Sequence, residues 1–295
     1  MRVARRDLPM FDDVDAEAIG PCDAVGCALG QAAGFGEVGP AVYPGVDHME
    51  TNEVTADPRR ALVKMQDWVN VHTNCGHDHG LDAEQPETSY WYRNIGSEVR
   101  LIALDTVNRF GGWQGCLHRE QFNWLSQMLD ESKDKYVVLT SHHPLENLFN
   151  GYVPEEESAP ALEEEVRRLL EKHPNVILWF SGHVHDHKIT QSRTSDGSHA
   201  FWEIRTGSHI DWPQQSRVLE IVKEENAIAI ASTVIDHEGH LDWQGKDLDY
   251  LTMAGISRAL SLNDWQRRDD FNPVLARHGN KEDRNVVWRV SDPFS

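Results

Sequence analysis

The sequence feature that most constrains the fold is an apolar run that ends in histidines. Val176–Phe180 is continuously apolar, and Ser-Gly-His-Val-His-Asp-His follows it directly at 181–187. Such a run predicts a buried strand, and the glycine predicts a turn at its end. In extended backbone His183 and His185 project to the same side, so both can converge on one metal ion or on two adjacent ions.

A second histidine pair stands upstream in the same position relative to an apolar run. Tyr136–Thr140 predicts a buried strand, and Ser141-His142-His143-Pro144 follows it. Ligands in open α/β folds gather at the carboxyl ends of strands. We therefore expect the two histidine-bearing strand ends to form a single site.

These segments resemble a known family. Gly182–His185 is similar to the closing GHxH motif of the calcineurin-like metallophosphoesterases, and Ser141–Pro144 to their preceding histidine motif. Further segments match in the family's order, from about Thr55 to the C-terminus. They are an LD…GxLxxxQxxWL segment (Leu104, Asp105, Gly115, Leu117, Gln121, Trp124, Leu125), two strands after GHxH (Phe201–Ser208, Arg217–Ile221) and a segment similar to a bacterial subfamily (Asp211–Gln215).

The resemblance implies an α/β fold, a metallophosphoesterase-like mixed β-sandwich flanked by helices. It also implies phosphoester hydrolysis by two divalent ions about 3.5–4 Å apart. The metal ligands it implies are His142, His183 and His185, and His143 and His209 are expected to bind substrate. Imidazole ligands favour Mn, Fe, Zn or Ni. Asp105 is expected to be structural, and His187 is expected at the surface.

The chain also departs from the family, because three N-terminal metal motifs are not found. These are Asp-x-His, Gly-Asp-x-x-Asp and Gly-Asn-His-Asp/Glu. Asp13–Asp15 and Asp47-His48 follow no apolar run, and Asn74–Asp78 imitates the asparagine motif without a preceding strand. We therefore expect at most one bound ion and a fold that is incomplete in its N-terminal half. The catalytic residues stay unknown.

Composition and periodicity predict three regions. Residues 1–54 are predicted to be an irregular or disordered leader, 55–241 the C-terminal part of a metallophosphoesterase domain, and 242–295 a helical or irregular extension. One sheet is expected from strands at Val99, Tyr136 and Val176, and a second from strands near Phe201, Val218 and Ala227. One of these sheets should show an unpaired edge or an exposed apolar face. A hairpin over 90–104 and helices over 121–129, 162–170 and 253–265 complete the prediction.

Charge and apolar content restrict location and partners. The net charge is -20, from 48 acidic and 28 basic residues, and such a field repels nucleic acid and anionic membranes. No apolar stretch approaches the ~20 residues of a membrane span, and no apolar signal segment follows Met1–Asp7. The four cysteines form no CxxC pair, which favours free thiols. We expect a cytoplasmic protein with no nucleic-acid or membrane partner.

Three functions remain open. The first is a metal-dependent phosphoesterase that is truncated or diverged in its first half and poorly active alone, acting on a small phosphoester. The second is a non-catalytic remnant that serves as a binding or interaction module. The third is half of a split enzyme, completed by another chain that carries the missing motifs.

Overall fold

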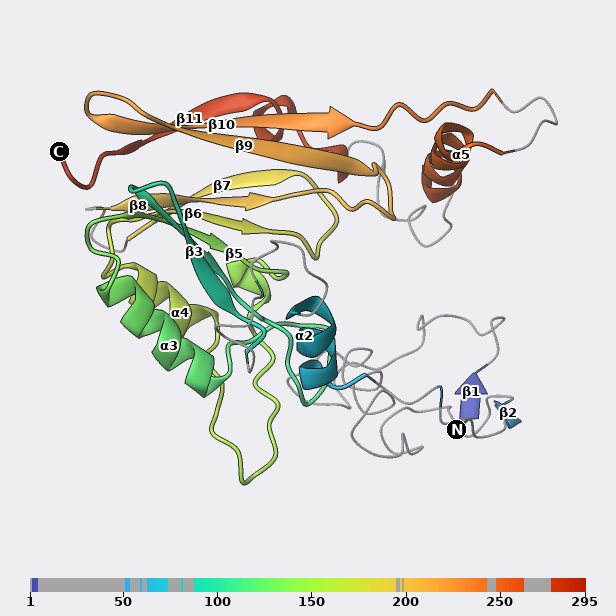
Figure 1. Ribbon diagram of the computed structural model, residues 1–295, viewed down its shortest axis with the longest axis horizontal. Coiled ribbons are helices and arrows are strands. Elements are labelled where there is room, and N and C mark those ends of the chain that lie inside the picture. The colour runs from blue at the N-terminus through green and yellow to red at the C-terminus, as the bar shows by residue number, and fades with distance from the viewer. Residues whose placement is uncertain are drawn as a thin grey trace. The chain divides into compact units, whose positions relative to one another are not determined.

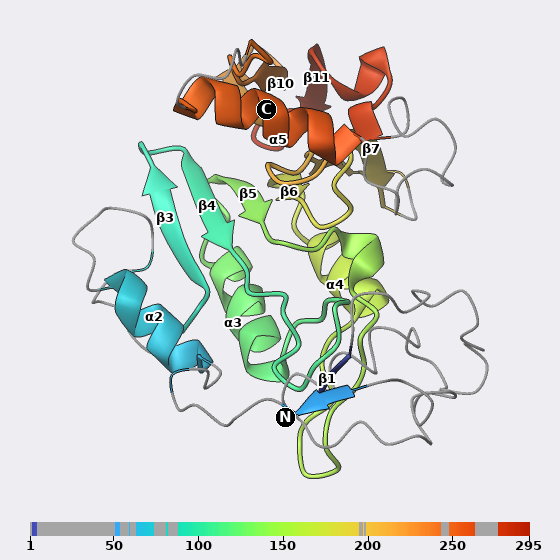
Figure 2. The same cartoon turned by 90° about the vertical axis from the view of Figure 1, so that its right-hand side faces the viewer.

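A six-stranded mixed sheet positions both histidine-bearing loops. The computed structural model describes residues 2–4, 51–53, 59, 63–73, 81, 88–194, 197, 199–242, 248–262 and 277–295. The strand order is β3-β4-β5-β6-β8-β7, in which β4, β5, β6 and β8 are parallel and β7 is antiparallel to β8 (Figures 1 and 2). The bounds are β3 Trp91–Ile95, β4 Val99–Ala103, β5 Tyr136–Thr140, β6 Val176–Ser181, β7 Lys188–Arg193 and β8 Ala200–Arg205.

The two central strands are the ones that the apolar runs predict. Four consecutive residues of β5 are buried, and so are four of β6. Unbroken burial of this kind is typical of parallel strands that are covered on both faces. Because Thr140 is in register with Phe180, the carboxyl ends of β5 and β6 lie at the same edge of the sheet.

A second, three-stranded antiparallel sheet packs on one face of the first and appears as a separate layer in Figure 1. Its order is β11-β10-β9, with bounds β9 Gln215–Lys223, β10 Ala227–Asp236 and β11 Val286–Ser291. A shared hydrophobic core joins the layers through Tyr136, Val138, Ile177, Leu178, Ile204, Ile228, Ile230 and Val290. Full burial of one Leu or Ile side chain contributes about 1.5–3 kcal/mol, so each fully buried member of this core stabilises the packing of the two sheets.

The mixed β-sandwich with helices is confirmed, but one strand assignment is wrong. The strand at Phe201 is β8, which pairs with β6 and β7 in the first sheet. The third strand of the second sheet is β11, within the predicted C-terminal extension, where no strand was expected. Both sheets are open in the described part of the chain, with β3 and β7 at the edges of the larger one. Any open sheet has two edges, so the incomplete N-terminal half stays a prediction.

The predicted helices are present with small shifts of their ends. They are α3 Arg119–Asp130, α4 Glu163–Leu170 and α5 Tyr250–Leu262, and α2 Met65–Thr73 precedes them. Short 3₁₀ turns lie at η5 Leu145–Asn147 and η7 Lys281–Asp283. No helix within the described ranges has the length and apolarity that a bilayer span requires.

The chain divides into two compact units. The first comprises Met1–Trp91, Asp105–Leu125 and Leu145–Val166, and the second Tyr92–Leu104, Ser126–Pro144 and Arg167–Ser295. Both sheets of the sandwich fall in the second unit, except for the first residue of β3. The first unit includes a two-stranded antiparallel pair, β1 Arg2–Ala4 with β2 Thr51–Glu53. The rest of the predicted leader, together with Asp13–Asp15, Asp47-His48 and Asn74–Asp78, lies outside the described residues.

Within the first unit, the LD…GxLxxxQxxWL segment stabilises a loop. The Gln121 side chain forms two hydrogen bonds with the Asp105 backbone. Its Oε1 accepts from the amide at 2.9 Å, and its Nε2 donates to the carbonyl at 2.5 Å. The Asp105 carboxylate accepts from the Ser89 hydroxyl and from the Val107 amide. These bonds are consistent with the structural role expected of Asp105.

Candidate metal centre

The sheet brings His142 and His183 together at the ends of neighbouring parallel strands. The β5–β6 hydrogen bonding continues past both strands, from the Ser141 amide to the Phe180 carbonyl and from the Gly182 amide to the His142 carbonyl, each at 3.0 Å. Strand spacing is about 4.7–4.9 Å, so residues one step beyond each strand are neighbours. This explains the proximity of two histidines that are 41 residues apart in the sequence.

The loop after β6 does not keep the extended backbone that the sequence analysis assumed. His183 and His185 have φ angles of 67° and 61°, in the left-handed region that costs a non-glycine residue roughly 1–2 kcal/mol. Their side chains therefore take different directions, with His183 against His142 and His185 against Asp211. Strained residues of this kind cluster at functional sites.

Three imidazoles form a cluster, which we call the imidazole cluster: His142, His143 and His183. Their potential ligand atoms all lie within 4.8 Å of one another. His183 Nδ1 and His142 Nε2 are 3.1 Å apart. Two nitrogens that bind one Zn²⁺ at about 2.1 Å stand about 3.0–3.4 Å apart for N–Zn–N angles between 90° and tetrahedral. The observed separation suits two donors to a single ion.

The electrostatic environment favours the neutral form of His183 and His142. Burial, and then the charges of the three neighbouring histidines, lowers the pKa of His183 to about 3. Burial, and then the charge of His185, also lowers the pKa of His142. A neutral imidazole is the form that binds a metal ion, so His183 and His142 are in their ligand form at neutral pH.

His185 stands beside the cluster and is held by a carboxylate. Its Nδ1 lies 2.5 Å from Asp211 Oδ2, a contact that makes Nδ1 the donor and leaves the lone pair on Nε2. Carboxylate partners of this kind fix the tautomer and orientation of metal-binding histidines. The loop itself is braced by Asp186, which accepts two hydrogen bonds from Arg205 at 2.9 and 2.8 Å, and by Arg277, which donates to the Val184 carbonyl.

The predicted site residues are therefore distributed over three environments. The cluster contains His142 and His183 from the predicted ligand set, together with His143, which was predicted to bind substrate. His185 contacts Asp211 instead. His209 is exposed and pairs with Ser216 Oγ at 2.9 Å, outside the clustered ligand atoms.

The expectation that His187 lies at the surface is wrong. Its side chain is 1% exposed, and both ring nitrogens bond to protein groups. The i, i+2, i+4 spacing gave no sign of this, because its partners Gln215 and Arg217 come from β9.

The donor set fits a transition metal ion. Three imidazoles are borderline ligands that suit Mn, Fe, Zn or Ni. Among the described residues, the group with converging ligand atoms contains no carboxylate that could bridge to a second ion. Sequence reasoning did not assign Asp211, although an aspartate in the loop after a strand that follows GHxH was a usable signal.

Comparisons with known proteins relate part of the chain to one family. Residues 47–187 match the family model described as calcineurin-like phosphoesterase, a segment that includes both histidine-bearing loops. No curated protein matches the chain. A solved structure of a dimetal phosphatase from Danio rerio aligns at 17% identity and a TM-score of 0.34, over 48% of this chain and 57% of that one, a likeness too low to bear on function. Over residues 47–187, just under half of its length, this chain is similar to the calcineurin-like phosphoesterases.

Proposed function

We propose that this chain is a metal-dependent phosphoesterase whose imidazole cluster binds one divalent transition metal ion, and that it is poorly active alone. One observation carries the proposal: three imidazole ligand atoms lie within 4.8 Å at the carboxyl ends of two parallel strands. The family match independently supports metal-dependent phosphoester hydrolysis at the family level.

In this proposal the chain's own residues would hold the metal ion and orient its ligands. His142, His183 and His143 supply nitrogen donors, and His185, aligned by Asp211, is a further donor. A bound ion would supply Lewis-acid polarisation of a phosphoryl oxygen and a lowered pKa of bound water. Substrate binding by His209 stays a prediction, as does a small phosphoester as the substrate. For His143 we propose metal binding in place of the substrate binding predicted from the sequence. A net charge of -20 disfavours a nucleic-acid substrate.

Poor activity is expected because the clustered ligand atoms include no carboxylate. Two-metal clamping neutralises the charge that develops on phosphoryl oxygens in the transition state. A single ion held by imidazoles provides only part of that stabilisation. A partner chain carrying the missing motifs would raise the activity, whereas a binding module would bind metal with no turnover under any condition.

Isothermal titration calorimetry of the metal-free chain with Zn²⁺ or Mn²⁺ tests the site. We expect about one equivalent to bind to the wild type and none to His183→Ala. The matched control is His240→Ala, an exposed histidine outside the cluster, which should bind as the wild type does. Unchanged binding in His183→Ala would remove the basis of the proposal.

Hydrolysis of bis(p-nitrophenyl) phosphate with added Mn²⁺ tests the activity. We expect turnover near background in the wild type and little further change in His183→Ala. Strong metal-dependent turnover that disappears in His183→Ala would contradict poor activity. It would show that carboxylates outside the cluster complete the site.

A further inference from the structure

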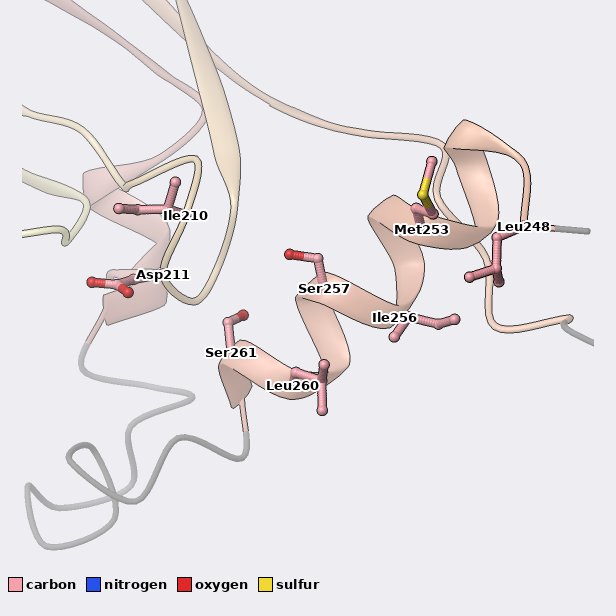
Figure 3. A pocket seen from close by; sticks show the side chains of 8 residues that line it. All are labelled: Ile210, Asp211, Leu248, Met253, Ile256, Ser257, Leu260 and Ser261. Atoms are coloured by element: carbon pink, nitrogen blue, oxygen red, sulfur yellow. The ribbon is translucent and has the colours of Figure 1, made fainter. Parts of the chain in front are cut away.

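A pocket of about 510 Å³ lies between α5 and the loop that carries Asp211. Figure 3 shows Ile210 and Asp211 on one side, and side chains of α5 on the other. Five of the eight lining residues are apolar, among them Ile210, Ile256 and Leu260. This volume and a mainly apolar lining with a few polar groups are typical of small-molecule sites.

The wall formed by α5 is held in place by specific contacts. Gln214 Nε2 donates to Ser257 Oγ at 3.0 Å. The Arg258 guanidinium lies 5.5 Å from the centre of the Trp212 ring and forms an ion pair with Asp236. A methyl group at Gly255 would overlap the His240 carbonyl oxygen, so glycine allows the helix to lie directly against that segment. The pocket is therefore preformed.

One residue connects this pocket to the candidate metal centre. Asp211 lines the pocket and also bonds to His185 Nδ1 at 2.5 Å, and His185 lies in the same loop as His183, two residues further along the chain. A residue that lines the pocket is therefore in direct contact with His185, one of the predicted metal ligands. Its rim is apolar and open to solvent, since Ile210 is 76% and Leu260 67% exposed.

The residues that line the pocket indicate which kind of ligand it binds. The eight lining residues include no lysine, arginine or histidine, so the pocket offers no positive charge to an anionic group. An apolar ligand group in the pocket would cover the exposed side chains of Ile210 and Leu260 and remove their apolar surface from water. An uncharged hydrocarbon group attached to a phosphate at the imidazole cluster would satisfy both features.

We propose that this pocket binds the apolar part of the phosphoester substrate, so that the chain selects esters of hydrophobic alcohols over esters of polar or charged ones. This deepens the proposed function and rests on it. Each buried methylene is expected to tighten binding about fourfold, the equivalent of its transfer free energy from water.

Binding of ethyl, butyl and hexyl phosphate, measured by calorimetry with and without Zn²⁺, tests the proposal. In the wild type the affinity should rise about fourfold per methylene. Leu260→Gln should flatten this dependence on chain length. The control Leu251→Gln changes a leucine of the same helix that is 45% exposed and outside the lining, and it should keep the dependence.

The two proposals fail in different ways. An affinity independent of chain length in the wild type, or a dependence equally steep in Leu260→Gln, would overturn the pocket assignment. A chain-length dependence that persists while Zn²⁺ adds no affinity, in the wild type and in His183→Ala alike, would overturn the phosphoesterase function and leave the apolar pocket standing.

Discussion

Two histidine groups that are close in sequence have opposite surroundings. In the imidazole cluster, ring nitrogens approach one another, and His183 Nδ1 lies 3.1 Å from His142 Nε2. In the second group, which we call the His187 network, one buried ring bonds only to other kinds of side chain and to backbone. Its Nε2 contacts Gln215 Oε1 at 3.1 Å, and its Nδ1 accepts from Arg217 Nη2 at 2.9 Å and from the Gly207 amide at 3.2 Å.

The histidine pKa is lowered in both groups, so a lowered pKa does not distinguish a candidate metal ligand from a structural histidine. Burial is the largest cause in each, lowering the pKa of His183 to about 3 and that of His187 to about 4. What differs is the partner of each nitrogen. In the His187 network both nitrogens are committed to protein groups, and no lone pair is available to an ion. In the imidazole cluster, nitrogens converge at the spacing that one ion needs.

The largest expected effect is the loss of stability in His187→Ala. This change leaves the buried Gly207 amide without its acceptor and removes a partner from Arg217 and Gln215. Unsatisfied buried groups cost about 1–3 kcal/mol each, so we expect a loss of about 3 kcal/mol. Urea denaturation followed by circular dichroism measures it. His142→Ala, at an exposed site, should lose less than about 1 kcal/mol, and equal losses would contradict the distinction.

The second prediction concerns metal removal and addition. Zn²⁺ at a concentration of about 100 times its dissociation constant should stabilise the wild-type chain by about 2.7 kcal/mol, and EDTA should reverse this. The stabilisation should disappear in His183→Ala, because that change removes a donor from the cluster. It should persist in His240→Ala. Thermal denaturation with and without Zn²⁺ checks all three proteins, and equal stabilisation in His183→Ala would place the ion elsewhere.

The third prediction tests whether Asp211 positions His185. Asp211→Asn should weaken Zn²⁺ binding about tenfold, since carboxylate partners of ligand histidines typically contribute 10–100-fold in metal affinity. Asp211→Glu restores the charge and should recover part of the loss. Asp134→Asn, a 76% exposed carboxylate outside the site, is the control. A lack of change in Asp211→Asn would show that His185 does not bind the ion.

The sequence predicts local features of this fold better than long-range ones. The runs that form β5 and β6 are unambiguous because both are continuously apolar. Sheet membership is not encoded locally, and so β8 was assigned to the wrong sheet. Strand β11 was missed because most of its residues are exposed or half-buried within a polar segment.

In the candidate site too, the sequence predicts the local features and misses the long-range contacts. The motifs identify His142 and His183 from their places at strand ends. They do not reveal the left-handed backbone at His183 and His185, nor that His183 contacts His142 whereas His185 contacts Asp211. The partners of His185 and His187, which are Asp211, Gln215 and Arg217, lie 26 to 30 residues further along the chain, and no local pattern links them.

The smallest expected effect comes from replacing a glycine by alanine, and it differs between two glycines, one beside each histidine group. A methyl group at Gly207 would stand 3.0 Å from His187 Nε2 and 3.2 Å from Cε1. The ring cannot move away, because three hydrogen bonds hold it. Gly207→Ala should therefore cost about 1 kcal/mol, at the low end of overpacking effects.

The matched control is Gly182→Ala, beside the imidazole cluster. There the nearest atom to the added methyl group is the His142 carbonyl oxygen at 3.9 Å, an ordinary contact, and Gly182 is not among the residues with positive φ. We expect no loss of stability and unchanged Zn²⁺ binding, as measured by urea denaturation and calorimetry. If Gly182→Ala destabilised the chain as much as Gly207→Ala, the imidazole cluster would be as tightly packed as the His187 network, and it would lack the room that an ion needs.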